Sequence, residues 1–285
     1  MRLLAVGHVT WDRLQDQETL GGTVCYAALT ARKLGWEAGV LTAAGADFDP
    51  LRDLPGVAVF VEPSSATTRF VNLYDSEGRR SQALASRAQD VALTALPDAW
   101  RDPDVLLLGP VAGELRGAFA TAFAAEVVGA TAQGWLRRFD PDGSVSPREW
   151  PNPKADLAGV HALFLSEHDL PSAGEWARKR LSNVPIVAVT RGWEGVTLLT
   201  RQGVHQVPGL PRSETDATGA GDVFAAAFLV SYRETGDVVE AAAFANCAAS
   251  CAVEALGAQG LGDRGEIEKR LSLRRRLLEE GEWDE

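Results

Sequence analysis

Familiar phosphate-binding signatures are absent from this sequence of 285 residues. No segment has the form G-x-x-x-x-G-K-[ST], which excludes a Walker-type phosphate loop. The first apolar run, residues 3–6, continues into Gly-His-Val-Thr and not into G-x-G-x-x-G. The glycine fingerprint of dinucleotide-binding folds is therefore missing from the place where it would occur. A phosphate site in this chain has to be of another kind.

Basic charge and cysteine are both scarce. The formal net charge is −11, from 28 basic and 39 acidic residues, which argues against a general nucleic-acid surface. A local site for a small anion is still compatible with this balance. The three cysteines show no metal-type spacing. Cys247 and Cys251 lie four apart in an Ala-rich apolar stretch, which favours buried small side chains over a metal or redox site and fits a reducing compartment.

Long apolar runs are absent too. Residues 3–6 form too short a run for the core of a signal peptide, and no window reaches the length that spans a membrane. Hydrophobic residues make up 46% and charged residues 24%, as in an ordinary soluble domain. We therefore expect a cytoplasmic protein, a monomer or a homodimer, whose partner is a small molecule and neither nucleic acid nor a membrane.

Short apolar runs alternate with longer Ala-rich stretches along the chain. The runs lack polar alternation, which predicts strands buried on both faces in a mostly parallel sheet covered by helices. The predicted strands are 3–6, 38–42, 105–108, 127–132, 161–165, 186–190 and 196–200. The predicted helices are 23–34, 116–125, 223–230 and 263–280.

One polar stretch departs from this pattern. Residues 67–74 and 79–84 alternate polar with apolar side chains around a polar turn at 75–78, which predicts a hairpin. Together with the short polar segment 13–20, it is expected to form a small antiparallel β lid. The lid would comprise 13–20 and 67–86, and the main α/β domain 1–12, 21–66 and 87–285. A surface hairpin without a role accounts for the same pattern.

The segment Asp216-Ala217-Thr218-Gly219-Ala220-Gly221-Asp222 carries the sharpest chemical signal, because an apolar helix follows it at once. Its small residues allow a tight turn and close approach of a ligand. A helix that begins there directs free N–H groups and the positive end of its dipole at an anion. Asp222 could take a proton from an incoming hydroxyl while the N–H groups stabilise a transferring phosphoryl group. Taken alone, GAGD indicates an ordinary helix start more readily than a catalytic site.

Two segments resemble the signatures of one enzyme family. Residues 216–222 resemble the C-terminal signature of the ribokinase-like (PfkB) carbohydrate kinases, and residues 21–35 resemble the N-terminal one. The spacing of the two glycine sites and the order of the pieces match along nearly the whole chain. The resemblance implies a three-layer ribokinase-like α/β fold, with a mostly parallel sheet, helices on both faces and a small β lid. It also implies ATP- and Mg²⁺-dependent phosphorylation of a hydroxyl of a small polyol or sugar.

The resemblance assigns roles on the acceptor side. The expected catalytic residues are Gly219, Ala220 and Gly221 as the anion hole and Asp222 as the general base. Asp12 corresponds to the acidic residue that binds acceptor hydroxyls, a role that suits a carboxylate just past a strand end. Gly21 and Gly22 match the hinge on which the lid closes over substrate and excludes water.

On the donor side, the expected nucleotide-binding residues are Thr190, Gly192, Gly195 and Asn246. The family's N-x-x-E element, linked to Mg²⁺ and phosphate, stands here as Ser166-Glu167-His168-Asp169, which keeps a hydroxyl and a carboxylate. The expected metal-site residues are Ser166, Asp169 and Asp216. Residues 255–262 occupy the place where many relatives bind a monovalent cation, so K⁺ is a further expected cofactor.

Departures from the family pattern bear on the acceptor. Tyr26 stands where an Asn commonly faces the sugar, which argues against ribose. Three features resemble the plant-type myo-inositol kinases: the aromatic at position 26, the segment Glu18 to Gly22, and the stretch 133–140. That stretch could bring Gln133 and Arg137 or Arg138 towards the substrate and the γ-phosphate, since the guanidinium fork pairs phosphate oxygens. A polyol such as myo-inositol is the expected acceptor. A nucleoside or ketose kinase, or a non-catalytic sugar-sensing protein on the same fold, are the alternatives.

Overall fold

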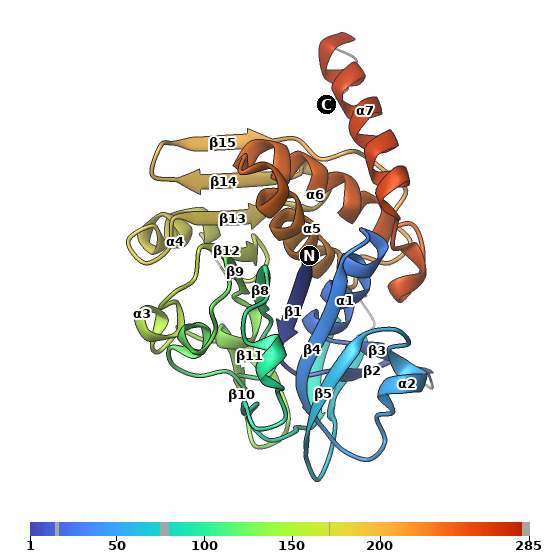
Figure 1. Ribbon diagram of the computed structural model, residues 1–285, viewed down its shortest axis with the longest axis vertical. Helices are drawn as coiled ribbons and strands as arrows, with labels where there is room; N and C mark the ends of the chain where they lie inside the picture. Colours follow the sequence, from blue (N-terminus) through green and yellow to red (C-terminus); the bar gives the residue numbers. More distant parts are fainter. Residues whose placement is uncertain (15–16, 75–79, 171, 281–285) are drawn as a thin grey trace.

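The computed structural model describes residues 1–14, 17–74, 80–170 and 172–280. A nine-stranded sheet in the order β15-β14-β13-β12-β9-β8-β1-β4-β5 forms its centre (Figure 1). These strands are β1 (Arg2–Val6), β4 (Glu37–Ala44), β5 (Ala58–Pro63), β8 (Val105–Leu108), β9 (Val127–Thr131), β12 (Ala162–Ser166), β13 (Ile186–Thr190), β14 (Val196–Thr200) and β15 (Val204–Val207). The strands from β13 to β5 run parallel, whereas β14 and β15 are antiparallel additions at one edge. The mostly parallel sheet expected from the apolar runs is confirmed.

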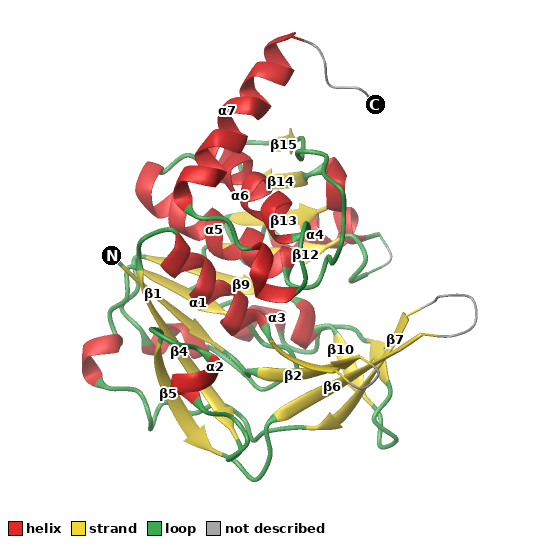
Figure 2. Cartoon of the chain, turned by 90° about the vertical axis from the view of Figure 1, so that its right-hand side faces the viewer, coloured by secondary structure: helices red, strands yellow, loops and turns green. Residues whose placement is uncertain are grey.

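Both faces of the sheet are buried. Successive side chains of a strand point to opposite faces, so each strand contributes to two separate core clusters. Leu3 and Ala5 of β1 belong to the core cluster under the long helices, and Leu4 and Val6 to the cluster on the other face. The long helices of the first face are α1 (Thr23–Lys33), α5 (Ala220–Thr235), α6 (Val238–Ala252) and α7 (Arg264–Glu280), and α7 extends beyond the body of the molecule (Figures 1 and 2). The three-layer arrangement is therefore confirmed.

The second face is covered by shorter elements and loops. They include α3 (Pro153–Asp156), α4 (Ala173–Arg180), η1 (Asp98–Trp100), η2 (Phe119–Ala122) and η3 (Gln133–Trp135). The remaining short helices are α2 (Pro50–Asp53), η4 (Gly192–Glu194) and η5 (Gly257–Gly260). Trp100, Trp135 and Trp150 fill much of the space between these loops and the sheet. None of the helices in the described ranges has the length and apolarity that crossing a membrane requires.

A four-stranded sheet in the order β3-β2-β6-β7 lies apart from the main sheet (Figure 2). It comprises β2 (Thr10–Leu14), β3 (Gln17–Gly21), β6 (Thr68–Tyr74) and β7 (Arg80–Ser86). The predicted hairpin of β6 and β7 pairs antiparallel, and so do β2 and β3, but β2 and β6 pair parallel to each other. The expectation of a wholly antiparallel sheet is wrong at this seam. Between the two hairpins the chain forms α1, β4, α2 and β5. A long connection of this kind allows the strands on either side of it to pair parallel. The predicted turn at 75–78 lies outside the described residues.

Two further details differ from the sequence analysis. The expected helix 116–125 is wrong, because only the short 3₁₀ segment η2 forms there. Gly117 adopts φ +66° and donates its N–H to Asp156 Oδ1 at 2.7 Å, so the backbone leaves the right-handed helical region at that point. A short hairpin of β10 (Arg137–Phe139) and β11 (Val145–Pro147), which no sequence pattern predicted, lies beside β7. The prediction that Cys247 and Cys251 are buried is confirmed, and both are free thiols.

Candidate active site

The glycine-rich turn before α5 is shaped by a backbone conformation that side chains disfavour. Gly219 has φ +79°, and a Cβ there would overlap the ring of Tyr26. α5 begins at Ala220, so Asp222 falls in its first turn. Within the described part of the chain, the N–H groups of Gly219 and Gly221 donate to no protein acceptor. The turn therefore presents backbone donors where a helix dipole also favours an anion.

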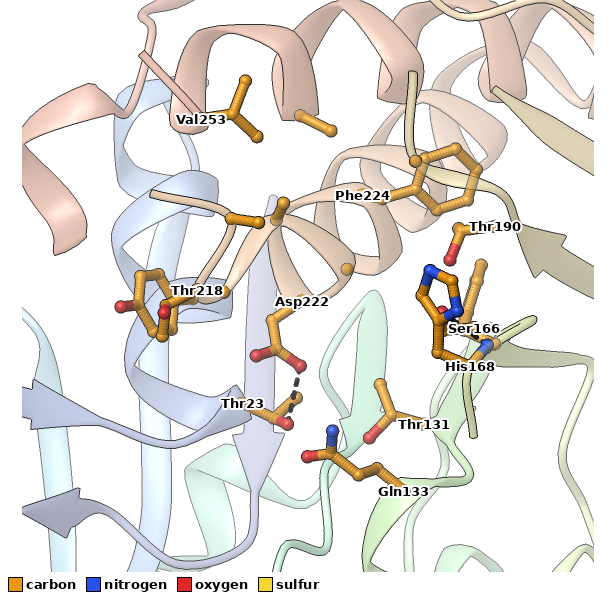
Figure 3. Close-up of a pocket in the computed structure, with 18 of the residues that line it drawn as sticks. Thr23, Thr131, Gln133, Ser166, His168, Thr190, Thr218, Asp222, Phe224 and Val253 are labelled. Atoms are coloured by element: carbon orange, nitrogen blue, oxygen red, sulfur yellow. Dashed lines mark hydrogen bonds between the residues drawn. The ribbon is translucent and has the colours of Figure 1, made fainter. Parts of the chain in front are cut away.

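Asp222 points from this turn into a cavity and towards Thr23 (Figure 3). The Thr23 hydroxyl donates to Asp222 Oδ1 at 2.7 Å. Burial raises the pKa of Asp222 to about 6, while the Thr23 hydrogen bond and the charge of Arg137 oppose this rise. Asp169 and Asp12 raise the same pKa through charge repulsion. The carboxylate is consequently ionised at neutral pH and still basic enough to accept a proton.

The cavity has a volume of about 610 Å³ and gathers most of the residues that the sequence analysis singled out. Those that line it are Asp12, Gly22, Tyr26, Gln133, Arg137, Ser166, Asp169, Thr190, Gly192, Gly195, Gly219, Ala220, Gly221, Asp222 and Asn246. They come from both ends of the sequence, and parallel strands bring them to one edge of the sheet. Gly21, Arg138 and Asp216 do not line the cavity.

Each of these three residues makes contacts outside the cavity. Arg138 alternates with Arg137 on β10 and pairs with Asp140, its Nε lying 3.1 Å from Oδ1. Gly21 lies so close to the Asp12 carboxylate that a Cβ would overlap it. The Asp216 carboxylate accepts the N–H of Thr218 at 2.9 Å and that of Gly257 at 3.1 Å, so it joins the turn before α5 to η5.

Tyr26 contributes to the cavity and also packs against the glycine-rich turn. It is 5% exposed, and its ring packs against Gly219 at the back of the glycine-rich turn. Burial, followed by the charge of Asp222, raises the pKa of its hydroxyl well above the ordinary value, so the group is neutral. Tyr26 therefore supports the backbone of the anion site while its edge contributes to the cavity wall.

The cavity also contains residues that the sequence analysis missed. Thr23, Phe70 and Gln82 line it alongside Asp12. The guanidinium of Arg137 lies over the Phe70 ring, 5.7 Å from its centroid. Thr23 directly follows the double glycine, which was a usable signal, whereas nothing in the sequence marks Phe70 or Gln82.

A buried carboxylate outside the cavity holds one of the loops that line it. Glu114, 1% exposed, accepts the N–H of His8 at 2.8 Å through Oε1 and that of Ala112 at 2.7 Å through Oε2. It also accepts the N–H of Val111, which lines the cavity, at 3.0 Å. One side chain thus joins the loop after β1 to the loop after β8. Sequence reasoning missed Glu114 because no motif surrounds it.

The metal-site expectations fit this geometry unequally. Ser166 and Asp169 line the cavity, and Asp169 Oδ2 accepts the N–H of Ser166 at 2.8 Å. Burial raises the pKa of Asp169, so a cation beside it would be favourable. Among the described residues no cluster of three or more His, Cys, Asp or Glu side chains is found. Mg²⁺ bound by one carboxylate, water and substrate phosphates needs no such cluster, so Asp169 suits it better than Asp216 does.

Another wall of the cavity contains Asn246 together with both large and small side chains. Asn246 of α6, 7% exposed, donates through Nδ2 to the carbonyls of Val207 at 3.0 Å and Pro208 at 3.1 Å. It thereby ties α6 to the segment that carries Gly209. The other residues of this wall are Trp193, Leu210, Arg212, Ala249, Ser250 and Val253.

Comparison with known sequences finds similarity to carbohydrate and nucleoside kinases. Residues 139–263 match the family model described as pfkB family carbohydrate kinase. The chain is similar to an ATP-dependent ribose-1-phosphate kinase from Halopiger xanaduensis, with 25% identity over 91% of this chain and 93% of the relative. It is also similar to a nucleoside kinase from Methanothermobacter thermautotrophicus, with 24% identity over 95% of each chain.

Comparison with solved structures concerns the fold. A pyrophosphate-dependent kinase in the ribokinase family, complexed with a pyrophosphate analog and myo-inositol, superposes with a TM-score of 0.76 at 22% identity, over 93% of this chain and 99% of that one. A fructokinase with bound ATP from Xylella fastidiosa gives a TM-score of 0.77 at 18% identity, over 96% and 99%. These likenesses show a common fold over nearly the whole chain.

Proposed function

We propose that this chain, which has a ribokinase-like fold and matches the pfkB family carbohydrate kinase model over residues 139–263, transfers a phosphoryl group from ATP to a hydroxyl of a small polyol. The observation that carries this proposal is the position of Asp222. It lies in the first turn of α5, faces the cavity and stands beside backbone N–H groups that suit an anion. A non-catalytic sugar sensor would need no such base beside an anion site.

In the proposed reaction, Asp222 accepts the proton of the acceptor hydroxyl as that oxygen bonds to the terminal phosphorus of the donor. The N–H groups of Gly219 and Gly221 stabilise the negative charge on the phosphoryl oxygens, and the nucleoside diphosphate leaves. Arg137, which lies close enough to lower the pKa of Asp222, adds positive charge on the acceptor side. Asp12 and Gln133 bind other acceptor hydroxyls.

Two cofactors belong to the proposal. Mg²⁺, held by Asp169, Ser166 and phosphate oxygens, would neutralise charge on the donor. K⁺ would bind at the loop 255–262, which Asp216 joins to the turn before α5. We further propose that the sheet of β2, β3, β6 and β7 acts as a lid, with Gly21 and Gly22 as its hinge, because Asp12 and Phe70 extend from it into the cavity.

The donor part of the cavity favours ATP. Gly209, Ala249 and Ser250 line the same cavity as the glycine-rich turn, and their small side chains would let a flat base pack there, a contact that pyrophosphate would not make. Burying a base there would add binding free energy in proportion to the apolar area removed from water. Pyrophosphate is the competing donor, because a structural neighbour is described as pyrophosphate-dependent.

The acceptor part of the cavity favours a polyol over a nucleoside. Arg137 covers one face of the Phe70 ring, and the Tyr26 ring packs against Gly219. Phe70 is 2% and Tyr26 5% exposed, so neither ring offers an open face for stacking on a nucleobase. Asp12, Gln82 and Gln133 supply polar groups for hydroxyls. Myo-inositol is the best candidate. Nucleosides and ketoses are the alternative acceptors.

The decisive experiment is a screen of phosphoryl transfer by the purified full chain with Mg²⁺. Each of ATP and pyrophosphate would be paired with myo-inositol, ribose, ribose 1-phosphate, fructose, adenosine and cytidine, and phosphorylated product would be measured directly. The expected result is the highest kcat/KM for ATP with myo-inositol. A clear preference for a nucleoside would overturn the acceptor assignment, a preference for pyrophosphate would overturn the donor assignment, and no transfer with any pair would overturn the kinase assignment.

A further inference from the structure

We infer that Thr23 is a positioning residue for Asp222, holding its carboxylate in one orientation and favouring its ionised form. The two residues are 199 positions apart and are joined by the 2.7 Å hydrogen bond from the Thr23 hydroxyl to Asp222 Oδ1 (Figure 3). A hydroxyl bound to one carboxylate oxygen leaves the other oxygen to receive the acceptor proton. The inference rests on the proposed role of Asp222 as general base.

The environment of Thr23 fixes the direction of its hydroxyl. Thr23 is 1% exposed, and its methyl group packs so tightly against Gly109 that a Cβ there would overlap it. On the other side, Gly22 precedes it at φ +90°, with no room for a Cβ beside the carbonyl of His8. Thr23 is thus wedged between the end of β8 and the double glycine, so the rotamer that reaches Asp222 is imposed by packing.

The charged groups around Asp222 make this hydrogen bond consequential. Burial is the largest influence on the pKa of Asp222 and raises it, and Asp169 and Asp12 act in the same direction. Arg137 from β10 opposes them, as does the Thr23 hydroxyl. The Cys25 thiol and the Tyr26 hydroxyl on α1 also feel the charge of Asp222, and burial raises the pKa of both, so they are neutral. Among the described groups that act on Asp222, Thr23 and Arg137 are therefore the two that favour its carboxylate form.

Thr23→Val keeps the shape of the side chain and removes the hydroxyl, while Thr23→Ser keeps the hydroxyl and removes the methyl. The pKa of Asp222 would be measured in the donor-free protein from the ¹³Cγ signals of labelled aspartates, with the Asp222→Asn spectrum identifying the signal. A hydrogen bond to a charged group of ordinary strength corresponds to an upward shift of about 1–2 pH units in Thr23→Val. Thr23→Ser is expected to titrate within about 0.5 unit of the unmodified protein.

Activity supplies a second readout with ATP and myo-inositol. The acid limb of kcat/KM in Thr23→Val should move to higher pH by the same amount, with partial recovery above pH 8 and rescue in Thr23→Ser. An unshifted Asp222 signal in Thr23→Val, or a Thr23→Ser titration that follows Thr23→Val, would overturn the inference. Failure of the proposed function gives a different result. In that case Asp222→Asn would keep its turnover, or the unmodified protein would show none. The titration of Asp222 would still report on the Thr23 hydrogen bond.

Discussion

At the scale of single residues, Asp222 is held in a place that makes its charge unfavourable. Burial raises its pKa from the ordinary 3.8 to about 6. A raised pKa in the folded state means that the folded protein binds this proton more tightly than the unfolded chain does. The contribution to stability is full below about pH 4 and is lost as the pH rises through about 6. Stability is therefore given up at neutral pH for a carboxylate that can act as a base.

We predict that Asp222→Asn lowers kcat by about 10²–10⁴-fold, because the general base is removed while the anion site is kept. Urea unfolding between pH 4 and pH 8 should show a smaller fall in the free energy of unfolding than in the unmodified protein, by about 1–3 kcal/mol. The dissociation constant for an ATP analogue serves as the control and should stay within about threefold. A near-normal kcat at saturating acceptor would contradict the assigned role.

At the scale of secondary-structure elements, the cavity depends on loops that follow parallel strands. Glu114 joins two of them by accepting backbone N–H groups from His8, Val111 and Ala112. We predict that Glu114→Gln destabilises the protein by about 1–3 kcal/mol, since an amide cannot accept on both arms and leaves buried donors unpaired. The KM for the acceptor should rise as well, because Val111 lines the cavity.

Glu62 offers a matched control for this prediction. It is buried on β5, accepts the N–H of Ala95 at 2.6 Å and the hydroxyl of Thr94, and does not line the cavity. Glu62→Gln should lower stability to a similar extent without changing the acceptor KM. Equal KM changes in both variants would mean that general loosening, and not the Glu114 contacts, affects the site.

The small sheet provides a second test at this scale. If it is a lid, acceptor binding should slow amide exchange in β2 and β6, because Asp12 and Phe70 would hold it against the main domain. Exchange in β8, in the interior of the main sheet, should not change and serves as the reference. Equal protection of β2 and β6 with and without myo-inositol would speak against a lid.

At the scale of the whole molecule, the cavity lies across elements from both halves of the sequence, so a bound donor should stabilise the complete fold. A non-hydrolysable ATP analogue with Mg²⁺ at 100 times its dissociation constant adds about 2.7 kcal/mol, which corresponds to a rise in Tm of about 5 °C or more. Mg²⁺ alone is the control and should shift Tm by less than about 1 °C. A rise with pyrophosphate and none with the ATP analogue would reverse the donor assignment.

The sequence by itself determined the features that are written in consecutive residues. Strands such as 105–108 and 186–190, and the helix beginning at Thr23, follow from local apolar pattern and glycine stops. The turn before α5 is equally local, because Gly219 to Asp222 form both the helix start and the proposed site. Local chemistry acts over a few residues, so it can be read without knowing what lies across the molecule.

Only the tertiary structure decided which distant residues meet. The bond between Thr23 and Asp222 spans 199 positions, and the parallel pairing of β2 with β6 depends on the crossover between them. The pleat of β10 turns Arg137 towards the cavity and Arg138 away from it, a choice that two adjacent arginines do not reveal. These outcomes depend on which surfaces pack together, because packing minimises the exposed apolar area of the whole chain and is not encoded in any single segment.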